Sequence, residues 1–452
     1  MERKIPLYVL LLVLFFGALG TVGFGAAVQH VMLGGMALGK FGEALLAVAE
    51  YPKLLKQAVV ESVQQPQIIK DQFPELDGFK KSGQIPADVE SEKGYLLLSS
   101  YDPGKEQATT QLIRIRDQRR LYEWVPDIKK LAELEEKQGN KYSIEVFPWR
   151  FRMVHPLLLD DGGLVFHDVT PLFKIDQCSN LQWSVDGVFH HSIEPDGDGA
   201  IWVSSTLDPS SYEGTGIKHM DDAIVKLSLD GKVLYKKSIS RILEENGYRG
   251  LLYMGTFYSD PIHLNDIQPA LEDTEFWKRG DLFLSLRNRS TVLLYRPETN
   301  KVIWLNSGPW LNQHDVNIEN KTSITVFGND IVDAWGIPGE ESSFIVYPDG
   351  HINIYQYDFA TGVMKKPYTK VLKTMNVRTH GEGRAKLIRN KDILIEETEH
   401  ARMLMINPDR VKWEYVRRVD ENHLAMLTWS RYLTEEQVKH ILPKLESATC
   451  KQ

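Results

Sequence analysis

The stretch Gln313-His314-Asp315-Val316-Asn317-Ile318 decides how the chain is organised. Its histidine opens a strand-like run that reaches a turn at Glu319-Asn320-Lys321-Thr322, and a second run follows, Ser323-Ile324-Thr325-Val326-Phe327. Two such runs separated by a short polar segment predict a β-hairpin. The histidine therefore stands at the start of the first strand of a hairpin.

The same arrangement occurs at three other places in the chain. A histidine comes before a strand, a turn and a second strand at His155, His191 and His263. A pattern that returns in this way indicates an internal structural repeat.

From residue 94 onward the chain divides into six units of short strands and turns. Several units contain an apolar strand, a turn and a strand that ends in Trp or Tyr. Repeated groups of about four short strands predict an all-β fold, a six-bladed β-propeller over residues 93–433. A β-sandwich or a solenoid is the competing architecture, but neither explains the histidine that opens several units.

The two ends of the chain differ from this repeat. Residues 1–30 hold a charge-free run from Ile5 to Gln29, preceded by Arg3 and Lys4. At about 1.5 Å per residue this run spans a hydrocarbon core of roughly 30 Å, so it predicts a transmembrane signal anchor with a cytoplasmic stub. A cleaved signal peptide is the alternative, although the run exceeds the usual ~7–15 apolar residues.

Residues 31–92 are expected to form a helical region and a linker. The amphipathic pattern from Val31 to Ile69 predicts a helix that lengthens the anchor, lies on the membrane or pairs with a second copy. The Pro- and Gly-containing segment that follows is typical of a linker. Residues 434–452 are expected to form a C-terminal helix, Thr434 to Leu445, and a tail.

Composition and cysteine content exclude some classes of function. The 452 residues carry a net charge of -8, which argues against a nucleic-acid partner, because phosphate binding requires a basic face. The two cysteines, Cys178 and Cys450, fit no metal site. Whether they pair or remain free thiols is left open, and no metal or cofactor is expected.

In a propeller the first strand of each blade lines the central channel, so residues that open successive blades converge on the axis. Several histidines at equivalent positions, beside an arginine, are better explained by a shared site than by separate structural roles. His155 carries no further motif and is expected to be structural.

Several motifs together resemble the bacterial arylsulfate sulfotransferase family. They are Asn312-Gln313-His314-Asp315-Val316, Phe327-Gly328-Asn329-Asp330, His263-Leu264-Asn265-Asp266-Ile267 and Leu284-Ser285-Leu286-Arg287, with the pair His190-His191 before them. Members of this family are six-bladed propellers that act outside the cytoplasm without an adenylyl sulfate donor. The resemblance implies that His314 is transiently sulfated. It also matches His191, His263, Asn265 and Arg287 to the family's remaining site residues.

The sequence departs from the family pattern at several points. The usual Phe-Asp-Asn-Gly reads Phe327-Gly328-Asn329-Asp330, and Leu264 replaces a proline. The segment Ala270 to Arg279 is an insert, and the N-terminal region lacks the family's usual β-sandwich. These departures concern substrate choice and oligomeric state more than the chemistry, and a homo-oligomer is left open.

Sulfuryl transfer passes through a loose transition state, as phosphoryl transfer does. It requires a neutral nucleophile, for which the imidazole of His314 is suited, and donors for the sulfuryl oxygens, which Arg287 and Asn265 supply. His263 and His191 are the candidates for proton transfer, since imidazole titrates near neutral pH. The expected reaction moves a sulfuryl group from an aryl sulfate to a phenolic or other hydroxyl acceptor.

Two other functions compete with this prediction. The chain is alternatively a non-catalytic, membrane-tethered β-propeller that binds or scaffolds a partner, because fold alone does not decide function. A hydrolase that uses the same histidine, with water as acceptor, is the third hypothesis. Glu382, at the opening of the sixth unit, is a further candidate to face the channel. The expected location is the inner membrane, single-pass, with the propeller on the periplasmic side.

Overall fold

The structure is a computed structural model. It describes residues 7–32, 48, 67–141, 150–212, 216, 219–255, 259–334, 344–389 and 391–450. The chain separates into two compact units, Met1–Pro66 and Gln67–Gln452.

The first unit contains one described helix, α1 (Leu7–Met32), over the charge-free run of the sequence. Among the residues that the structure describes, no helix is long and apolar enough to cross a membrane. Most of the helix expected between Val31 and Ile69 lies outside the described residues, whereas Ile68 and Ile69 are in a strand.

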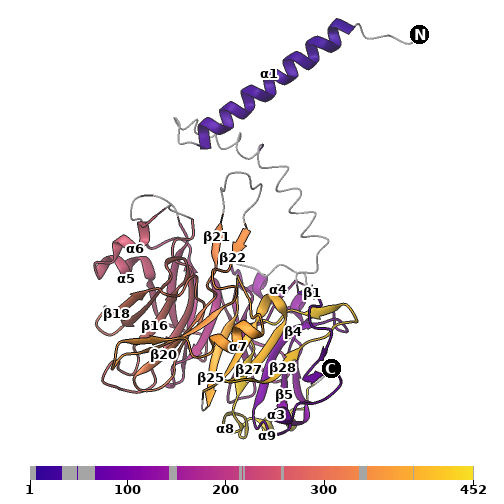
Figure 1. Cartoon of the computed structure of the whole chain (residues 1–452), viewed down its shortest axis with the longest axis vertical. Helices are drawn as coiled ribbons and strands as arrows, with labels where there is room; N and C mark the ends of the chain where they lie inside the picture. The colour runs from indigo at the N-terminus through magenta and orange to yellow at the C-terminus, as the bar shows by residue number, and fades with distance from the viewer. Residues whose placement is uncertain are drawn as a thin grey trace, which may run out of the picture. The chain divides into compact units, whose positions relative to one another are not determined.

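The second unit is a six-bladed β-propeller of four-stranded antiparallel sheets (Figure 1). Blade 1 consists of β30 (Arg431–Leu433), β4 (Tyr95–Asp102), β5 (Gln107–Arg114) and β6 (Arg119–Trp124). Blade 2 consists of β7 (Val154–Leu158), β8 (Leu164–His167), β9 (Leu172–Ile175) and β10 (Leu181–Val185). Blade 3 consists of β11 (Val188–Pro195), β12 (Ala200–Leu207), β13 (Asp221–Ser228) and β14 (Val233–Ser238).

The remaining three blades follow in chain order. Blade 4 consists of β15 (Leu264–Pro269), β16 (Leu282–Leu286), β17 (Thr291–Arg296) and β18 (Lys301–Ser307). Blade 5 consists of β19 (Val316–Ile318), β20 (Ser323–Gly328), β23 (Asn353–Asp358) and β24 (Val363–Lys365). Blade 6 consists of β25 (Arg384–Arg389), β26 (Asp392–Glu397), β27 (Arg402–Ile406) and β28 (Val411–Val416). The six blades confirm the predicted propeller.

Blade 1 differs from the sequence prediction in its innermost strand. That strand, β30, comes from the C-terminal part of the chain and pairs with β4, Arg431 opposite Leu97 and Leu433 opposite Tyr95. The predicted first unit, which began at Tyr95, supplies only three strands. The ring is therefore closed by hydrogen bonds between the two ends of the propeller sequence.

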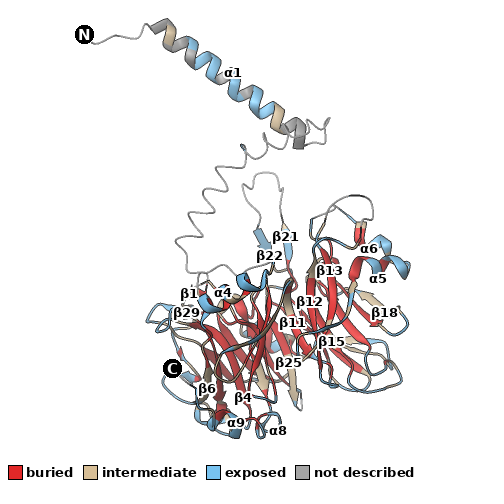
Figure 2. Ribbon diagram, turned by 180° about the vertical axis from the view of Figure 1, so that it is seen from behind, coloured by how far each residue is buried: buried red, intermediate tan, exposed pale blue. Residues whose placement is uncertain are grey.

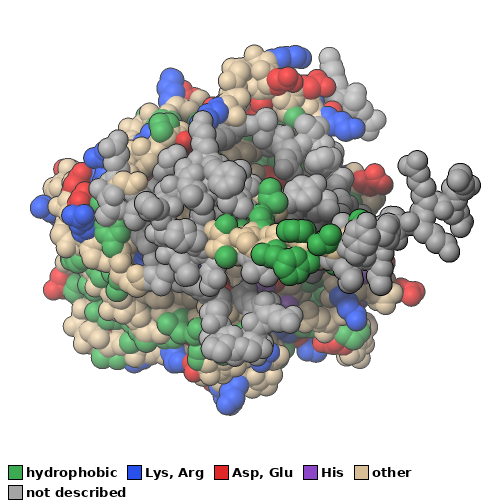
Figure 3. Space-filling view, turned by 90° about the horizontal axis from the view of Figure 1, so that it is seen from above, with side chains coloured by type: hydrophobic (Ala, Val, Ile, Leu, Met, Phe, Trp, Pro, Cys, Tyr) green, Lys and Arg blue, Asp and Glu red, His purple; other side chains and the backbone are tan. Residues whose placement is uncertain are grey.

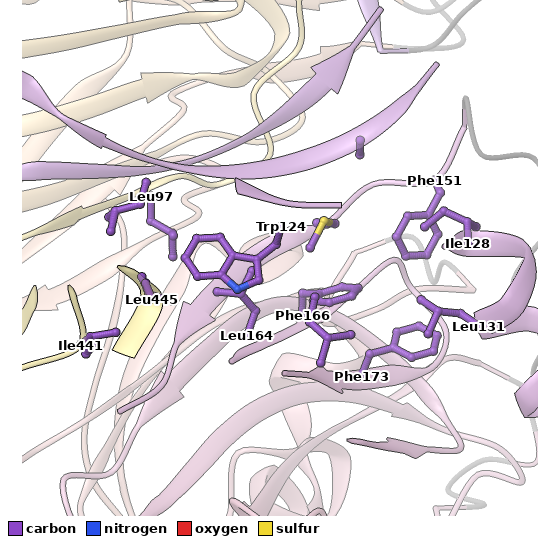
Figure 4. Close-up of a cluster of buried hydrophobic side chains, with 14 of the residues drawn as sticks. Leu97, Trp124, Ile128, Leu131, Phe151, Leu164, Phe166, Phe173, Ile441 and Leu445 are labelled. Carbon is purple, nitrogen blue, oxygen red and sulfur yellow. The ribbon is translucent and has the colours of Figure 1, made fainter. Parts of the chain in front are cut away.

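Apolar side chains fill the space between adjacent blades. One cluster lies at each of the six interfaces, and the cluster between blades 1 and 2 includes Trp124, Phe151, Phe166 and Phe173 (Figure 4). The indole N–H of Trp124 donates to the carbonyl of Gly162 at 3.1 Å, which satisfies its one polar atom. Buried residues follow the strands, whereas the peripheral helices are more exposed (Figure 2). The core is thus divided among the blade interfaces and leaves the axis to polar residues.

Several short elements lie outside the blades. They are the helices α4 (Ile128–Gln138), α5 (Ile239–Glu245), α6 (Arg249–Tyr253) and α7 (Thr369–Thr374), the hairpin β21 (Val332–Ala334) with β22 (Phe344–Val346), and the 3-10 turns η1 (Ile115–Asp117), η2 (Arg287–Arg289) and η3 (Thr398–His400). The hairpin β21–β22 and the helices α5 and α6 occupy the upper side of the propeller in Figure 1. Ser290, which follows η2, has φ of 45°.

Residues 67–92 are structured, in contrast to the linker expected there. They form β1 (Ile68–Lys70), which pairs with β29 (His423–Ala425), the hairpin β2 (Leu76–Asp77) with β3 (Lys80–Lys81), and α3 (Ala87–Glu90). Phe79 packs on Trp413 and Tyr415 of β28, with ring centroids 5.3 and 4.7 Å away. This segment therefore covers the outer strand of blade 6. Its apolar side chains hold it there, although its composition is rich in turn-forming residues.

The C-terminal segment forms two short helices instead of the one predicted. They are α8 (Glu435–Val438), capped by Thr434, and α9 (Leu442–Glu446). Pro443 lies in the first turn of α9, where its missing N–H costs little, but it interrupts a longer helix. Cys178 and Cys450 form a disulfide, with Cα atoms 5.2 Å apart, which ties this segment to blade 2.

Candidate active site

The innermost strands of neighbouring blades are connected by one recurring hydrogen bond. A side chain near the start of one strand accepts, at 3.0 Å, from a backbone N–H of the strand in the next blade. The acceptors are His155, Ser192, Asp266 and Asp315, and the donors in the same order are Ile193, Ile267, Val316 and Ala385. These bonds define equivalent positions in blades 2 to 5.

The residue before each acceptor occupies the position that faces the predicted site. In blades 2 to 5 this residue is Val154, His191, Asn265 and His314. His155 is therefore one residue out of step with His191 and His314. Its hydrogen bond to the backbone of Ile193 gives it the structural role expected of it.

The structure brings the predicted histidines together. The ring of His191 lies 5.0 Å from that of His263 and 6.0 Å from that of His314, measured between centroids. His191 and His263 have φ of 57° and 56°, a left-handed backbone that is uncommon for residues other than glycine. His263 is 29% exposed and borders solvent, whereas His314 is fully buried.

Trp429 completes the wall of this cluster. Its ring centroid lies 5.6 Å from that of His191 and 6.2 Å from that of His314. The sequence analysis missed this residue, because it belongs to the segment that leads into the closing strand β30 and follows no histidine motif. Viewed from above, charged side chains of both signs are distributed around the periphery of the molecule (Figure 3).

The hydrogen bonds of Asn329 determine which nitrogen of His314 carries the proton. The amide nitrogen of Asn329 donates to the carbonyls of Thr379 and Glu382, at 2.9 and 2.8 Å. Its Oδ1 is thereby left as an acceptor, and it lies 2.6 Å from Nδ1 of His314. Nδ1 must therefore carry the proton, and the lone pair lies on Nε2.

Nε2 of His314 has no hydrogen-bond partner in the described part of the chain. Burial, and then the charge of Arg287, lowers the pKa of this imidazole to about 3. His314 is consequently neutral at physiological pH, with a buried and unengaged lone pair. A nitrogen nucleophile must be unprotonated and must have a lone pair that no other group engages.

His263 and His191 are each held by a second polar group. Asp260 Oδ2 lies 2.5 Å from Nδ1 of His263, so that Nδ1 donates to the carboxylate. Nδ1 of His191 lies 2.8 Å from Nδ1 of His190, whose Nε2 faces Asp222 at 3.5 Å. Burial, together with the neighbouring histidines, lowers the pKa of His191 well below its ordinary value.

Asn265 and Arg287 contribute donors beside His314. The amide nitrogen of Asn265 donates to the carbonyl of Gln313 at 3.2 Å, and its Oδ1 is unpaired among the described residues. Arg287 Nη1 donates to Asn288 Oδ1 at 2.9 Å, and its buried Nε likewise has no partner there. Buried polar atoms without partners are rare and mark a site where a ligand or water is expected.

Glu382, the further candidate, is not placed with its carboxylate in the cluster. Its Oε1 pairs with Nη1 of Arg152 at 2.8 Å, and it is the backbone carbonyl that supports Asn329. In the portion of the chain that the structure describes, no group of His, Cys, Asp and Glu side chains is arranged to hold a metal ion.

The family model of arylsulfotransferase (ASST) matches residues 155–418, more than half of the chain. The chain belongs to the arylsulfotransferase family. Membership of this family implies a sulfotransferase-type enzyme on a β-propeller. The matched range includes all five residues predicted from the motifs, whereas Trp429 lies outside it.

Solved structures similar to this arylsulfotransferase-family chain are distant. A Bacteroides caccae protein of unknown function has 11% identity and a TM-score of 0.45, over 76% of this chain and 100% of that chain. Hydrazine synthase of Kuenenia stuttgartiensis has 13% identity and a TM-score of 0.39, over 67% and 71%. A streptogramin B lyase has 12% identity and a TM-score of 0.38, over 81% and 98%. No curated protein matches the chain.

Proposed function

We propose that the protein transfers a sulfuryl group from an aryl sulfate ester to an acceptor hydroxyl, with His314 as a transiently sulfated nucleophile. The observation that carries this proposal is the neutral imidazole of His314. Its Nδ1 proton is bound by Asn329, and its Nε2 is buried without a partner among the described residues. The ring of His314 also lies beside those of His191 and Trp429, with centroids 6.0 and 6.2 Å away.

In the first half-reaction Nε2 of His314 attacks the sulfur atom of the donor. The bond between nitrogen and sulfur forms as the bond between sulfur and the aryl oxygen breaks, and the phenolate leaves. His263, as the imidazolium that Asp260 orients, gives the phenolate its proton, and it regains a proton through solvent after His191 takes one in the second half-reaction. Arg287 and Asn265 stabilise the charge on the equatorial oxygens, which is greatest in the transition state.

In the second half-reaction the acceptor hydroxyl attacks the same sulfur atom. The bond from sulfur to Nε2 breaks, and the neutral imidazole of His314 is restored. With the proton of His190 on Nε2, facing Asp222, Nδ1 of His190 accepts a hydrogen bond from Nδ1 of His191. The lone pair of His191 is then on Nε2, and this nitrogen takes the hydroxyl proton. The depressed pKa of His191 keeps it unprotonated before this step.

The test is incubation of the purified protein with p-nitrophenyl sulfate, with and without phenol, near neutral pH. Release of nitrophenol that rises with added phenol, and a sulfuryl adduct on His314 found by mass spectrometry, are expected. Release that does not depend on phenol would indicate a hydrolase. Absence of both release and adduct would favour a non-catalytic propeller.

We also propose that residues 1–30 anchor the protein in the inner membrane, with the propeller in the periplasm. The support comes from the charge-free run from Ile5 to Gln29 behind Arg3 and Lys4, and from the disulfide between Cys178 and Cys450. Disulfides persist in oxidising compartments outside the cytoplasm. Carbonate extraction of membranes, with and without residues 1–30, tests the anchor, since an anchored protein stays in the pellet only when that segment is present.

A further inference from the structure

A cavity lies towards the opposite end of the innermost strands from the histidines. It has a volume of about 530 Å³ and is lined by residues from the ends of β7 and β11, from β25 and β30, and from the C-terminal segment. None of the five predicted site residues lines it. Small-molecule sites commonly occupy about 300–1,000 Å³. We call it the lower cavity, since α8 and α9 lie at the lower end of the propeller in Figure 1.

The inner end of the lower cavity carries three cationic side chains, Arg384, Lys386 and Arg431. Glu194 is shared between the two arginines, 3.5 Å from Nη2 of Arg384 and 3.3 Å from Nη1 of Arg431. Arg384 also faces Asp315 at 3.6 Å, and its Nε has no partner among the described residues. Arg384 and Glu194 are each 6% exposed, so this end is a buried polar group and not a solvated surface.

Glu396 is a further carboxylate at this end. It accepts from the backbone N–H groups of Trp429 and Ser430, at 2.7 and 2.8 Å, while burial raises its pKa. Three cations therefore stand beside the carboxylates Glu194, Glu396 and Asp315, and the buried Nε of Arg384 is a donor without a partner among the described residues. Burial, with repulsion from Arg384, lowers the pKa of Arg431 to about 10, despite the attraction of Glu194. An anionic group in the cavity would accept from the N–H at Nε of Arg384.

The rest of the cavity wall is largely apolar. It is formed by Leu157, Leu159, Ile201, Leu271, Leu394 and Ile441. Ile441 belongs to the C-terminal segment, which the disulfide ties to blade 2, so that the rim is held in place covalently. A cationic inner end with an apolar wall matches a molecule with an anionic head and a hydrocarbon body.

We propose that the lower cavity binds an amphipathic anion, whose sulfate, sulfonate or carboxylate group lies against Arg384, Lys386 and Arg431. The hydrocarbon body lies along the leucine wall towards Ile441. This site is separate from the histidine cluster. The ring of Trp429 stands between them, in contact with the histidines on one side and with the guanidinium carbon of Arg384, 5.6 Å from its centroid, on the other. The proposal does not depend on sulfuryl transfer at His314.

The test is a calorimetric titration of the purified full chain with octyl sulfate, below its micelle concentration, and with the uncharged octyl glucoside as comparison. Octyl sulfate is expected to bind at one site, at least about tenfold more tightly than octyl glucoside, as one charge-assisted hydrogen bond would give. Equal affinity for the two probes, or no binding of octyl sulfate, would overturn the proposal.

Two variants locate the site without disturbing the core. Lys386→Gln removes one cation, and Leu271→Asp changes a side chain that is 47% exposed at the mouth. Each is expected to weaken octyl sulfate binding about tenfold. The matched controls Lys365→Gln and Ile303→Asp, on the outermost strands of blades 5 and 4, are expected to leave it unchanged. Equal effects in variants and controls would contradict the assignment.

A separate measurement distinguishes the lower cavity from the catalytic site. Lys386→Gln is expected to release nitrophenol from p-nitrophenyl sulfate as fast as the unchanged protein, while its affinity for octyl sulfate falls. A parallel loss of both would place octyl sulfate at the histidine cluster and overturn the proposal. Failure of octyl sulfate to bind, with nitrophenol release intact, would leave the proposed function standing.

Discussion

His155 in blade 2 and His314 in blade 5 are two histidines in nearly the same setting. Both are fully buried near the start of an innermost strand, and burial lowers the pKa of both. In His155 both ring nitrogens are engaged: Nδ1 accepts from the backbone N–H of Ile193, and Nε2 lies against Nη1 of Arg384 and 3.4 Å from Glu194. In His314 the lone pair is on Nε2 and has no partner among the described residues.

This difference arises from a shift of one residue. Successive side chains of a strand point to opposite sides, so a one-residue offset changes what a side chain meets. His155 takes the position of Asp266 and Asp315, which join neighbouring blades, whereas His314 takes the position that adjoins the cluster. Burial and pKa do not distinguish His155 from His314, but the engagement of the lone pair does.

The largest expected contrast comes from replacing each histidine by alanine. His314→Ala should lower sulfuryl transfer by at least about a thousandfold and abolish the adduct, because no other group supplies the nucleophile. His155→Ala should keep the adduct and instead lower the free energy of unfolding by about 1–3 kcal/mol, because it leaves a buried N–H of Ile193 without a partner. Adduct mass and thermal unfolding measure the two effects. Loss of the adduct in a folded His155→Ala protein would remove the distinction drawn above.

Arg287 provides the next largest effect. Arg287→Ala should slow transfer about 100- to 1,000-fold, since removal of a donor to transition-state charge commonly costs that much. Arg287→Lys should recover part of the rate. The measurement is kcat/KM for p-nitrophenyl sulfate, and the exposed Arg249→Ala on α6 is the matched control. If Arg287→Ala had the same rate as this control, Arg287 would not contact the sulfuryl group.

Asn329 tests the tautomer of His314. Asn329→Ala should lower kcat about 100-fold, because Nδ1 of His314 loses the acceptor that keeps the lone pair on Nε2. Asn329→Asp keeps an acceptor and should restore part of the rate. Asn306→Ala, whose amide bonds only a loop carbonyl in blade 4, is the control. Equal rates in the alanine and aspartate variants would show that a structural change, and not the tautomer, caused the loss.

The smallest expected effect is on the pH dependence of stability, and His155 and His314 share it. The folded-state pKa of each lies below the unfolded value of about 6.5, so below pH 6.5 the unfolded chain binds protons that the folded chain does not. Stability should therefore fall as the pH falls below 6.5, by up to about 1.4 kcal/mol per pH unit for each histidine. His155→Asn and His314→Asn should both flatten the dependence of thermal midpoint on pH between 7 and 5. A slope unchanged by either variant would contradict the lowered pKa.

Much of the propeller could be predicted because its repeat is local. An apolar strand followed by a turn is visible in the sequence of each blade, and the histidines precede or lie in the innermost strands of blades 3 to 5. The composite first blade could not be seen in this way, because three-residue β30 lies more than 300 positions from its partner β4 and resembles a loop. The covering segment at residues 67–92 was not predicted, because its short strands are rich in Lys, Asp and Gly and resemble a linker. Only the packing of Phe79 on blade 6 shows that the segment is part of the fold.

Candidate site residues could be proposed from the sequence where they stand in a motif, and not where their position depends on the path of the chain. His314, His263, Asn265 and Arg287 stand in recognisable motifs, and Asn329 stood in one without a role being given to it. Trp429 has no motif, because its place beside His314 depends on ring closure. The offset of His155 depends on inter-blade hydrogen bonds, which no single stretch of sequence displays.

The closing strand also sets the order in which the protein can become active. Of the strands that build the propeller, β30 is the last to leave the ribosome, and Trp429 emerges just before it. Until then the edge of β4, with Leu96, Leu97 and Leu98, has no partner, and an unpaired apolar edge invites aggregation. A chain stopped short of residue 431 would lack the closed ring, and one stopped before Trp429 would also lack a wall of the histidine cluster. The ring and the wall of the histidine cluster can therefore form only after the last strand has been synthesised.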